Sequence, residues 1–322
     1  MCSFILLRCP ALLPAAAIFI PLVAKEKTMT KLPDGSIVAL ITPFHEDGSV
    51  NFEKLRELIE WHIEKKTDGI LVLGTTGESS TMTHQEDDDV VRVAIEQAAG
   101  RVPIIVGAGS NDSHTQLEKS VKYEKMGADG LLLISPYYNK ANRQGLIEHF
   151  KLSADNVNIP IILYNIPGRT GLSIPVDVVE ELSKHPMIQG IKEASGNISY
   201  AMDLAPLLNE DFKMYSGNDD IIVPMLSLGA SGVISVLADV LPEETHNLVH
   251  SYLNGDVKTS REIQLKYLDL IHKLFIEVNP IPVKEALNIM GKEVGGYRLP
   301  LWPMAENNRA ALEESMKKAG LV

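Results

Sequence analysis

The segment Met187-Ile188-Gln189-Gly190-Ile191-Lys192 decides how we interpret the fold of this chain. A short apolar run of this kind is typical of a buried strand. The lysine at its carboxyl end must either reach solvent or lie in a pocket. In a pocket, loss of hydration lowers the pKa of the amine, and a free amine can attack a ketone to form a Schiff base. Most lysines at strand ends are surface residues. Whether Lys192 reaches solvent or lies in a pocket therefore has to be judged from the rest of the sequence.

Seven further apolar runs resemble this one and alternate with helical patterns. They are residues 37–41, 69–73, 103–106, 130–134, 160–164, 212–216 and 232–236. Eight strand–helix units predict a parallel sheet and suit a closed (β/α)8 barrel. An open doubly wound sheet is the alternative. No Gly-x-Gly-x-x-Gly follows the first strand and no Gly-x4-Gly-Lys-Ser/Thr occurs, so neither a dinucleotide site nor a P-loop is expected.

Helical patterns complete this picture and extend beyond it. They cover residues 52–66 behind a capping Asn51, then 85–99, 113–126, 143–156, 175–184, 242–253, 258–275, 282–290 and 305–318. The last three exceed what a barrel needs. The predicted fold class is therefore α/β: a (β/α)8 TIM barrel over residues 29–255 with a C-terminal helical appendage over residues 256–322.

The first 28 residues do not fit this alternation. Cys9 to Ala24 carries no charge, is short for a membrane span and contains three prolines. We interpret residues 1–28 as an apolar extension in front of the true start at Met29. A secretory or targeting signal and a genuine structural extension are the alternatives.

Composition limits the functional classes. The chain has 322 residues and a formal net charge of −12, so neither a nucleic-acid surface nor an anionic membrane is an expected partner. Its two cysteines, Cys2 and Cys9, leave no internal disulfide and no catalytic thiol after Pro10. The histidines are scattered, without His-Glu-x-x-His or a tight His/Asp cluster along the sequence, so no metal site is expected. The acidic run Glu86–Asp89 is predicted to lie on a solvated helix face, where it complements the helix dipole.

Polar residues gather where the strands end, which is where chemistry collects in a barrel. The second strand runs into Gly74-Thr75-Thr76-Gly77-Glu78, whose free N–H groups and hydroxyls could hold a carboxylate. An ordinary tight turn is the alternative.

Two further strand ends carry a phenol and a guanidinium. The fourth strand continues into Pro136-Tyr137-Tyr138-Asn139, and the fifth into Tyr164-Asn165-Ile166-Pro167-Gly168-Arg169-Thr170-Gly171. A phenol can relay a proton, and an arginine can clamp a carboxylate through two hydrogen bonds. Tyr164 could instead be a core aromatic, and Arg169 a surface ion pair. The joint placement of these groups after strands two, four, five and six favours an active site.

These motifs together resemble the dihydrodipicolinate synthase (4-hydroxy-tetrahydrodipicolinate synthase) family. The resemblance is carried by residues 74–78, 136–139, 164–171, Gly190-Ile191-Lys192-Glu193-Ala194 and Asn279-Pro280-Ile281-Pro282-Val283-Lys284, and it extends from Gly35 to the C-terminus. It implies condensation of pyruvate with L-aspartate 4-semialdehyde in lysine and diaminopimelate biosynthesis, by a cytoplasmic lyase without cofactor or metal. It also implies a homotetramer built as a dimer of dimers.

The resemblance assigns four catalytic residues. Lys192 would form the Schiff base with pyruvate, and Tyr164 would shuttle protons during Schiff-base formation and cyclisation. Thr75 would link Tyr164 to a second tyrosine that reaches in from the neighbouring subunit. Tyr138 matches that second position.

Four substrate-binding residues follow in the same way. Thr76, together with Thr75, would hold the pyruvate carboxylate, and Arg169 would bind the semialdehyde carboxylate at the pocket mouth. Gly217 and Ile234 would line the pocket near Lys192 through their backbone carbonyls.

The chain departs from the lysine-inhibited members of the family at two positions. Those members carry a histidine three residues after the position of His84 and a glutamate four after that of Asn111, where this chain has Asp87 and Thr115. Ser79 and Tyr137 still match. We therefore expect feedback inhibition by lysine to be weak or absent.

Two alternatives remain open, one from the same superfamily and one from a different class. Related Schiff-base aldolases, such as N-acetylneuraminate lyase or keto-deoxy-sugar-acid aldolases, share the lysine, the tyrosine and the threonine-rich loop. They generally lack an arginine at the position of Arg169 and differ around Glu193-Ala194. A non-catalytic paralogue would be expected to lose Lys192, Tyr164 or Thr75, and this chain keeps all three.

Overall fold

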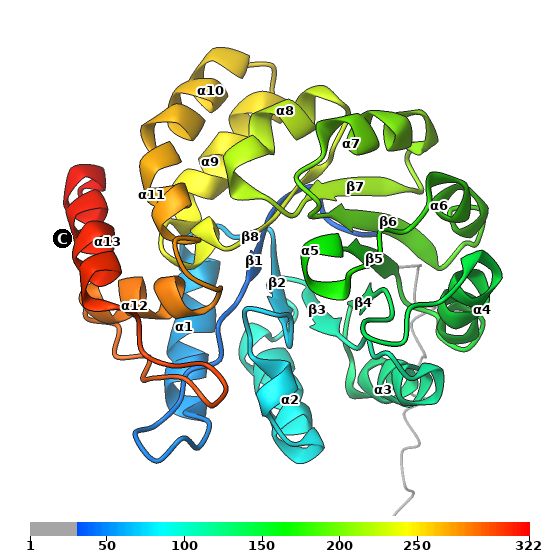
Figure 1. The fold of residues 1–322 in the computed structure, drawn as a ribbon, viewed down its shortest axis with the longest axis horizontal. Coiled ribbons are helices and arrows are strands. Elements are labelled where there is room, and N and C mark those ends of the chain that lie inside the picture. The colour runs from blue at the N-terminus through cyan, green and yellow to red at the C-terminus, as the bar shows by residue number, and fades with distance from the viewer. Residues whose placement is uncertain (1–30) are drawn as a thin grey trace, which may run out of the picture.

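Eight parallel strands close into a barrel in the computed structural model, which describes residues 31–322. Each strand pairs with the next, and the last pairs with the first (Figure 1). The strands are β1 (Gly35–Ala39), β2 (Gly69–Val72), β3 (Ile104–Gly107), β4 (Gly130–Ile134), β5 (Ile161–Asn165), β6 (Ile188–Glu193), β7 (Lys213–Ser216) and β8 (Gly232–Ser235). The predicted (β/α)8 barrel is confirmed. Residues 1–28 lie outside the described residues, and the assignment of Met29 as the start stays a prediction.

The strands are buried on both faces, which explains their continuous apolar sequences. Alternate side chains point into the barrel and form a compact interior cluster, made chiefly of Ile37, Leu71, Ile105, Leu132, Ile162, Tyr164, Tyr215 and Ile234. The intervening residues, such as Val38 and Ile70, belong to the larger core beneath the surrounding helices. The barrel is thus a packed core whose polar groups collect only at the strand ends.

Helices surround the barrel and connect its strands (Figure 1). They are α1 (Phe52–Glu64), α2 (His84–Ala98), α3 (Ser113–Met126), α4 (Arg143–Ala154), α5 (Pro167–Thr170), α6 (Val176–Leu182), α7 (Ile198–Leu204), α8 (Ile222–Ser227) and α9 (Pro242–Leu253). Short 3₁₀ turns are η1 (Ser79–Thr81), η2 (Ala205–Leu207), η3 (Asp219–Ile221) and η4 (Leu237–Asp239). Helix α3 has the predicted bounds because Asp112 caps its first turn and Gly127 ends it in the left-handed conformation.

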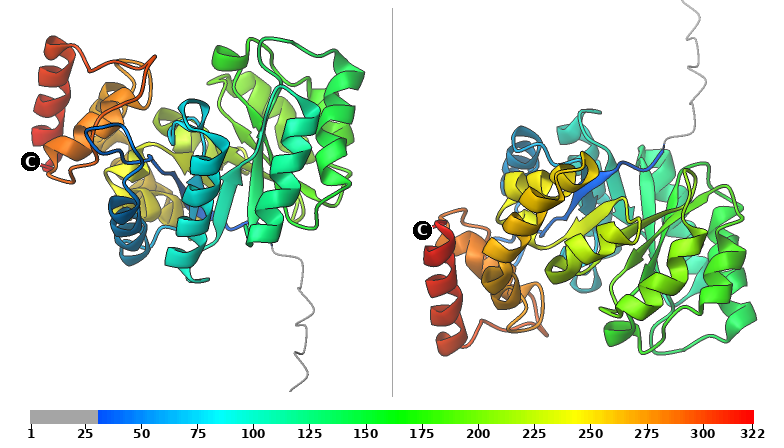
Figure 2. Two further views of the ribbon diagram at one scale, coloured as in Figure 1. Left: turned by 90° about the horizontal axis from the view of Figure 1, so that it is seen from below. Right: turned by 90° about the horizontal axis from the view of Figure 1, so that it is seen from above.

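Four helices follow the barrel: α10 (Val257–Lys266), α11 (Leu268–Lys273), α12 (Ile281–Ile289) and α13 (Glu306–Ala319). Helices α12 and α13 stand beside the barrel rather than in its ring (Figure 2). The prediction of one helix over residues 258–275 is wrong, because the chain breaks at Tyr267 between α10 and α11. Helix α10 packs against α9, and the division into domains at residue 255 stays a prediction.

The remaining differences from the sequence prediction concern short elements and strand ends. Helices α7 and α8 were not predicted, because six or seven residues carry too little periodicity. Strand β6 continues through Lys192 and Glu193, which pair in register with Tyr164 and Asn165 of β5. Across residues 31–322, no helix is long and apolar enough to span a membrane.

Candidate active site

Lys192 lies near the carboxyl end of β6 and is buried, with 6% of its surface exposed. Burial lowers the pKa of its amine to about 8, and the Arg169 charge acts in the same direction. The carboxylate of Asp219 opposes this effect, because it favours the ammonium form. At neutral pH a usable fraction of the amine is therefore unprotonated, as a nucleophile requires.

Tyr164 lies beside Lys192 on the neighbouring strand β5, where the two residues are register partners. The Lys192 Nζ atom is 4.6 Å from the centroid of the Tyr164 ring. Burial raises the pKa of Tyr164 to about 12, and its hydrogen bond with the Thr75 side chain opposes that rise. The phenol therefore keeps its proton until a partner takes it, which suits a relay that runs through Thr75.

The loop after β2 is held from several sides. Asn279 donates a hydrogen bond from its side-chain Nδ2 to the Thr76 Oγ1 atom at 2.9 Å. Thr42 donates to the Gly77 carbonyl at 2.6 Å. Thr76 is buried, and Thr75 and Thr76 both line the same cavity as Lys192. The loop is thus fixed before any carboxylate arrives.

Arg169 comes from α5, the short helix that follows β5. Its guanidinium donates to the Asn279 carbonyl at 3.0 Å, so one residue holds both Arg169 and Thr76. This contact uses only one of the arginine's donors, and the others stay available for an anion.

The cavity in front of the lysine, here called the Lys192 cavity, has a volume of about 400 Å³. It is lined by Thr75, Thr76, Tyr164, Arg169, Lys192 and Gly217 among others. A Cβ atom at Gly217 would lie 2.4 Å from the Ala194 Cβ, so only glycine fits there. Ile234 packs in the barrel interior with Tyr164, and Val236 rather than Ile234 lines the cavity.

Tyr138 is the one predicted catalytic residue that this chain does not bring into the site. Its side chain is 94% exposed, and its backbone has φ of +68°, a conformation that few non-glycine residues adopt. Neighbouring Tyr137 lines a different cavity. Within one copy of the chain, the Tyr164–Thr75 pair therefore has no third member.

A buried ion pair next to the threonine loop was not predicted. Lys284 of α12 donates from Nζ to Glu78 Oε1 at 2.8 Å, and both side chains are essentially inaccessible. Burial lowers the pKa of Lys284 to about 8, against the effect of Glu78. Glu78 adopts φ of +54° directly after the loop. Glu78 and Lys284 each belong to a motif noted in the sequence, residues 74–78 and 279–284, but nothing in the sequence indicates that the two motifs meet.

Two buried carboxylates beside Lys192 were also missed. Asp219 accepts hydrogen bonds from the Ser235 hydroxyl at 2.6 Å and from the Val236 and Leu237 amides at 3.0 and 2.9 Å. Glu193, next in sequence to Lys192, accepts a bond of 2.6 Å from the Asn165 side chain. These contacts fix the loops around the lysine, and only the folded barrel brings them together.

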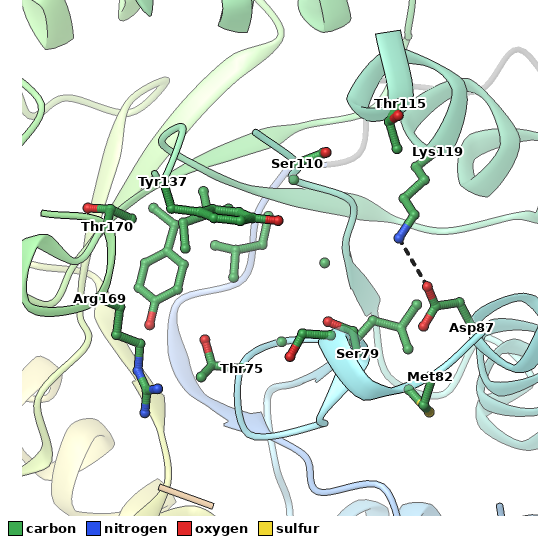
Figure 3. Close-up of a pocket in the computed structure, with 18 of the residues that line it drawn as sticks. Thr75, Ser79, Met82, Asp87, Ser110, Thr115, Lys119, Tyr137, Arg169 and Thr170 are labelled. Carbon is green, nitrogen blue, oxygen red and sulfur yellow. Dashed lines mark hydrogen bonds and ion pairs between the residues drawn. The ribbon is translucent and has the colours of Figure 1, made fainter. Parts of the chain in front are cut away.

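A second cavity of about 450 Å³, here called the Asp87 cavity, adjoins the first. Thr75, Tyr164 and Arg169 line both. Figure 3 shows Lys119 pointing toward Asp87 at one side of this cavity, with Arg169 on the other side and Thr75 between them. The two charged atoms are 3.0 Å apart, and the Asp87 side chain is 1% exposed. The prediction of a solvated face for the acidic run is therefore wrong for Asp87, since α3 covers it.

The expectation that no metal site exists concerned clusters visible along the sequence. The described residues that line the Lys192 cavity contribute no carboxylate, imidazole or thiol. Elsewhere, however, the fold assembles one His/Asp group, Asp68 with His246 and His250. The prediction that the histidines are scattered is therefore wrong for the folded chain.

The Lys192 cavity offers an amine, a phenol, hydroxyls and a guanidinium. These groups suit a small keto acid that reacts covalently with the amine.

Comparison with known proteins gives consistent results. The profile of the Dihydrodipicolinate synthetase family matches residues 32–319. The 4-hydroxy-tetrahydrodipicolinate synthase of Caldicellulosiruptor saccharolyticus is 55% identical over 287 residues, which cover 89% of this chain and 97% of that protein. The crystal structure of dihydrodipicolinate synthase from Aquifex aeolicus is 45% identical, with a TM-score of 0.87, covering 89% of this chain and 98% of that one. The chloride-inhibited enzyme from Acinetobacter baumannii, solved with pyruvate, is 41% identical, with a TM-score of 0.88, covering 90% and 99%.

Proposed function

Because the chain belongs to the Dihydrodipicolinate synthetase family, we propose that it condenses pyruvate with L-aspartate 4-semialdehyde through a Schiff base on Lys192. The product is 4-hydroxy-tetrahydrodipicolinate, an intermediate of lysine and diaminopimelate biosynthesis. The observation that carries the proposal is the register pair of Lys192 with Tyr164, at the edge of a cavity that also holds an arginine.

The reaction begins at the Lys192 amine. The unprotonated amine adds to the C2 carbonyl of pyruvate, and the carbinolamine loses its oxygen as water to give a protonated imine. This imine draws electrons from C3, so the methyl group loses a proton and becomes a nucleophilic enamine. Tyr164 carries protons to and from these centres, with Thr75 as its hydrogen-bonded neighbour.

The second half of the reaction uses the arginine. The enamine carbon attacks the aldehyde of the semialdehyde and forms the new carbon–carbon bond. The substrate's own amino group then attacks C2 and displaces the Lys192 amine, which closes the ring and frees the enzyme. Arg169 holds the semialdehyde carboxylate, and Thr75 and Thr76 hold the pyruvate carboxylate. Gly217 lines the same cavity, and Ile234 packs in the barrel interior with Tyr164.

The test measures turnover of the two substrates by the purified full chain, coupled to the NADPH-dependent reductase that consumes the product. Lys192→Ala should abolish turnover, whereas Lys184→Ala, at an exposed lysine, should not. If pyruvate is still trapped on Lys192 by borohydride but the semialdehyde is not consumed, the second substrate is a sugar-derived aldehyde instead. Turnover that survives Lys192→Ala would contradict the proposal.

We propose further that the active enzyme is a homotetramer in which Tyr138 completes the site of a neighbouring copy. Its full exposure and its constrained backbone favour a role outside its own subunit. Tyr138→Phe should lower turnover while Tyr137→Phe, the matched neighbour, changes it little. Sedimentation velocity would give the assembly state, and an active monomer would refute this part.

Both substrates are charged small molecules, and we propose a cytoplasmic location.

We also propose that lysine inhibits this enzyme weakly or not at all. An inhibitor with an ammonium group would need a free carboxylate in the Asp87 cavity, and Lys119 already occupies that carboxylate at 3.0 Å. Thr115 lines the same cavity with a neutral side chain. Strong inhibition in a lysine titration at sub-millimolar concentration would contradict this.

A further inference from the structure

A cluster of potential metal ligands lies at the end of the barrel opposite to Lys192. Asp68 directly precedes β2, whereas the threonine loop follows the same strand. His246 and His250 are four residues apart on α9, and residues at this spacing share one face of a helix. Asp68 lies 178 and 182 residues before the two histidines, and only the closed barrel brings it to them.

The donor atoms of this cluster converge. His246 Nδ1 is 3.0 Å from Asp68 Oδ2, and His250 Nε2 is 3.0 Å from both carboxylate oxygens. All three donor atoms lie within 4.8 Å of one another, which no other group of three such residues within residues 31–322 achieves. The two imidazole rings are in contact, with their centroids 4.0 Å apart and their planes tilted by 34°. The side chains are 17–33% exposed, so an ion and a water molecule can reach them.

The carboxylate is held in place independently of the histidines. Ser36 of β1 donates its backbone N–H to Asp68 Oδ2 at 2.8 Å. Gly35 leaves room for it, because a Cβ atom at that position would lie 2.1 Å from the same oxygen. The backbone of Gly35 also has φ of +121°, which favours glycine. One ligand is therefore oriented before any ion binds.

We propose that Asp68, His246 and His250 bind a divalent transition-metal ion of the zinc class. Two imidazoles and one carboxylate form a donor set that such ions prefer. Around a tetrahedral zinc ion, donors at about 2.1 Å lie roughly 3.4 Å apart, so each imidazole nitrogen must move only a few tenths of an ångström from its carboxylate oxygen, which is now at 3.0 Å. Binding displaces any proton shared between a ring nitrogen and the carboxylate, and water takes the fourth position.

This ion would have a structural role. Helix α9 follows β8, the strand that closes the barrel against β1. Asp68 directly precedes β2 and accepts a hydrogen bond from Ser36 of β1. A metal at the cluster joins the last helix of the barrel to its first two strands. The site lies at the far end of β2 from Thr75, so it stabilises the barrel and takes no part in the Schiff-base chemistry.

The experiment titrates the full chain, stripped with a chelator, with Co²⁺ followed by visible absorption, and with Zn²⁺ followed by thermal unfolding. We expect one equivalent of Co²⁺ and, with Zn²⁺ at about 100 times its dissociation constant, a rise of several degrees in Tm. His246→Gln, His250→Gln and Asp68→Asn should each weaken binding more than about tenfold. His185→Gln is the matched control, because His185 also contacts an aspartate, Asp155 at 3.1 Å, but without a third ligand.

Two results would overturn the proposal. One is no Co²⁺ absorption and no Tm shift in the unsubstituted chain. The other is binding that persists in all three ligand variants, which would assign the ion to another part of the chain such as Cys2 and Cys9. Circular dichroism and turnover should be unchanged in His250→Gln, the most exposed of the three sites, so that loss of binding there cannot be loss of fold.

Discussion

Two buried lysines of this protein have similarly lowered pKa values and differ in their partners. Burial lowers the pKa of both Lys192 and Lys284 to about 8. Lys284 donates to the Glu78 carboxylate at 2.8 Å and lies 4.1 Å from the centre of the Phe44 ring. Lys192 has no ion-pair partner among residues 31–322; it lies beside the Tyr164 ring, and both residues line an open cavity.

The comparison separates burial from reactivity. Burial alone produces a lowered pKa, and both lysines have one. What differs is whether the lone pair can reach a substrate, because the Lys284 amine is enclosed by its carboxylate and two aromatic rings. A lowered pKa therefore identifies an active-site lysine only together with an accessible cavity.

The largest expected effect is on covalent labelling. Borohydride reduction in the presence of pyruvate should modify Lys192 and leave Lys284 unmodified, as located by peptide mass spectrometry. Lys192→Met should abolish labelling and lower turnover more than about 1,000-fold, with little loss of stability because no partner is left unpaired. Labelling of Lys284 would mean that burial, rather than access, selects the reactive lysine.

At Lys284 we expect the opposite result, namely a large loss of stability. Lys284→Met leaves the Glu78 carboxylate buried without a partner, which should lower the free energy of unfolding by about 3–5 kcal/mol. Urea denaturation measures this loss. Glu78→Gln combined with Lys284→Met should recover part of it. Lys318→Met, at an exposed ion pair, should cost less than about 1 kcal/mol, and an equal cost at both sites would refute the argument.

Lys192 has a phenol beside it that can carry protons, that of Tyr164, whereas the amine of Lys284 is paired with a carboxylate. Tyr164→Phe removes the hydroxyl but keeps the ring beside the amine, so turnover should fall by about 100-fold or more while slow trapping of pyruvate on Lys192 persists. Single-turnover kinetics with each substrate would measure both steps. Unchanged turnover would exclude the phenol as the proton carrier.

The smallest effect concerns pH. The rate of pyruvate trapping should rise with pH and level off above about 8, as the Lys192 ammonium loses its proton. Asp219 favours that ammonium, so Asp219→Asn should lower the pKa of Lys192 and move the profile toward lower pH. Asp239→Asn, at another buried carboxylate, is the control and should not move it. A shift toward higher pH would contradict the assigned sign.

Much of the fold could be predicted from local sequence, because each strand is an apolar run between turn residues. Helix α3 matched to the residue, since Asp112 and Gly127 are strong local signals. The break at Tyr267 and the short helices α7 and α8 were missed, because tertiary packing rather than periodicity determines them. Charged Lys192 and Glu193 still belong to β6, because β5 and β7 hydrogen-bond to them.

The site followed the same division between local and long-range information. Lys192, Tyr164, Thr75, Thr76, Arg169 and Gly217 were all predicted, and all line one cavity. Burial of Asp87 under α3 and the meeting of Asp68 with two histidines were not, since both depend on contacts between distant segments. The His246-x3-His250 spacing was the one local signal that could have indicated the second cluster.

Asn279 has a consequence for the order in which the protein becomes competent during its synthesis. Its side chain holds Thr76 and its carbonyl holds Arg169, yet it lies beyond all eight strands in the chain. A ribosome that has released the whole barrel has therefore not yet made the residue that fixes both groups. A barrel that folded at this stage of synthesis would lack both contacts, and a chain split between α9 and Asn279 should regain full activity only when its two pieces meet.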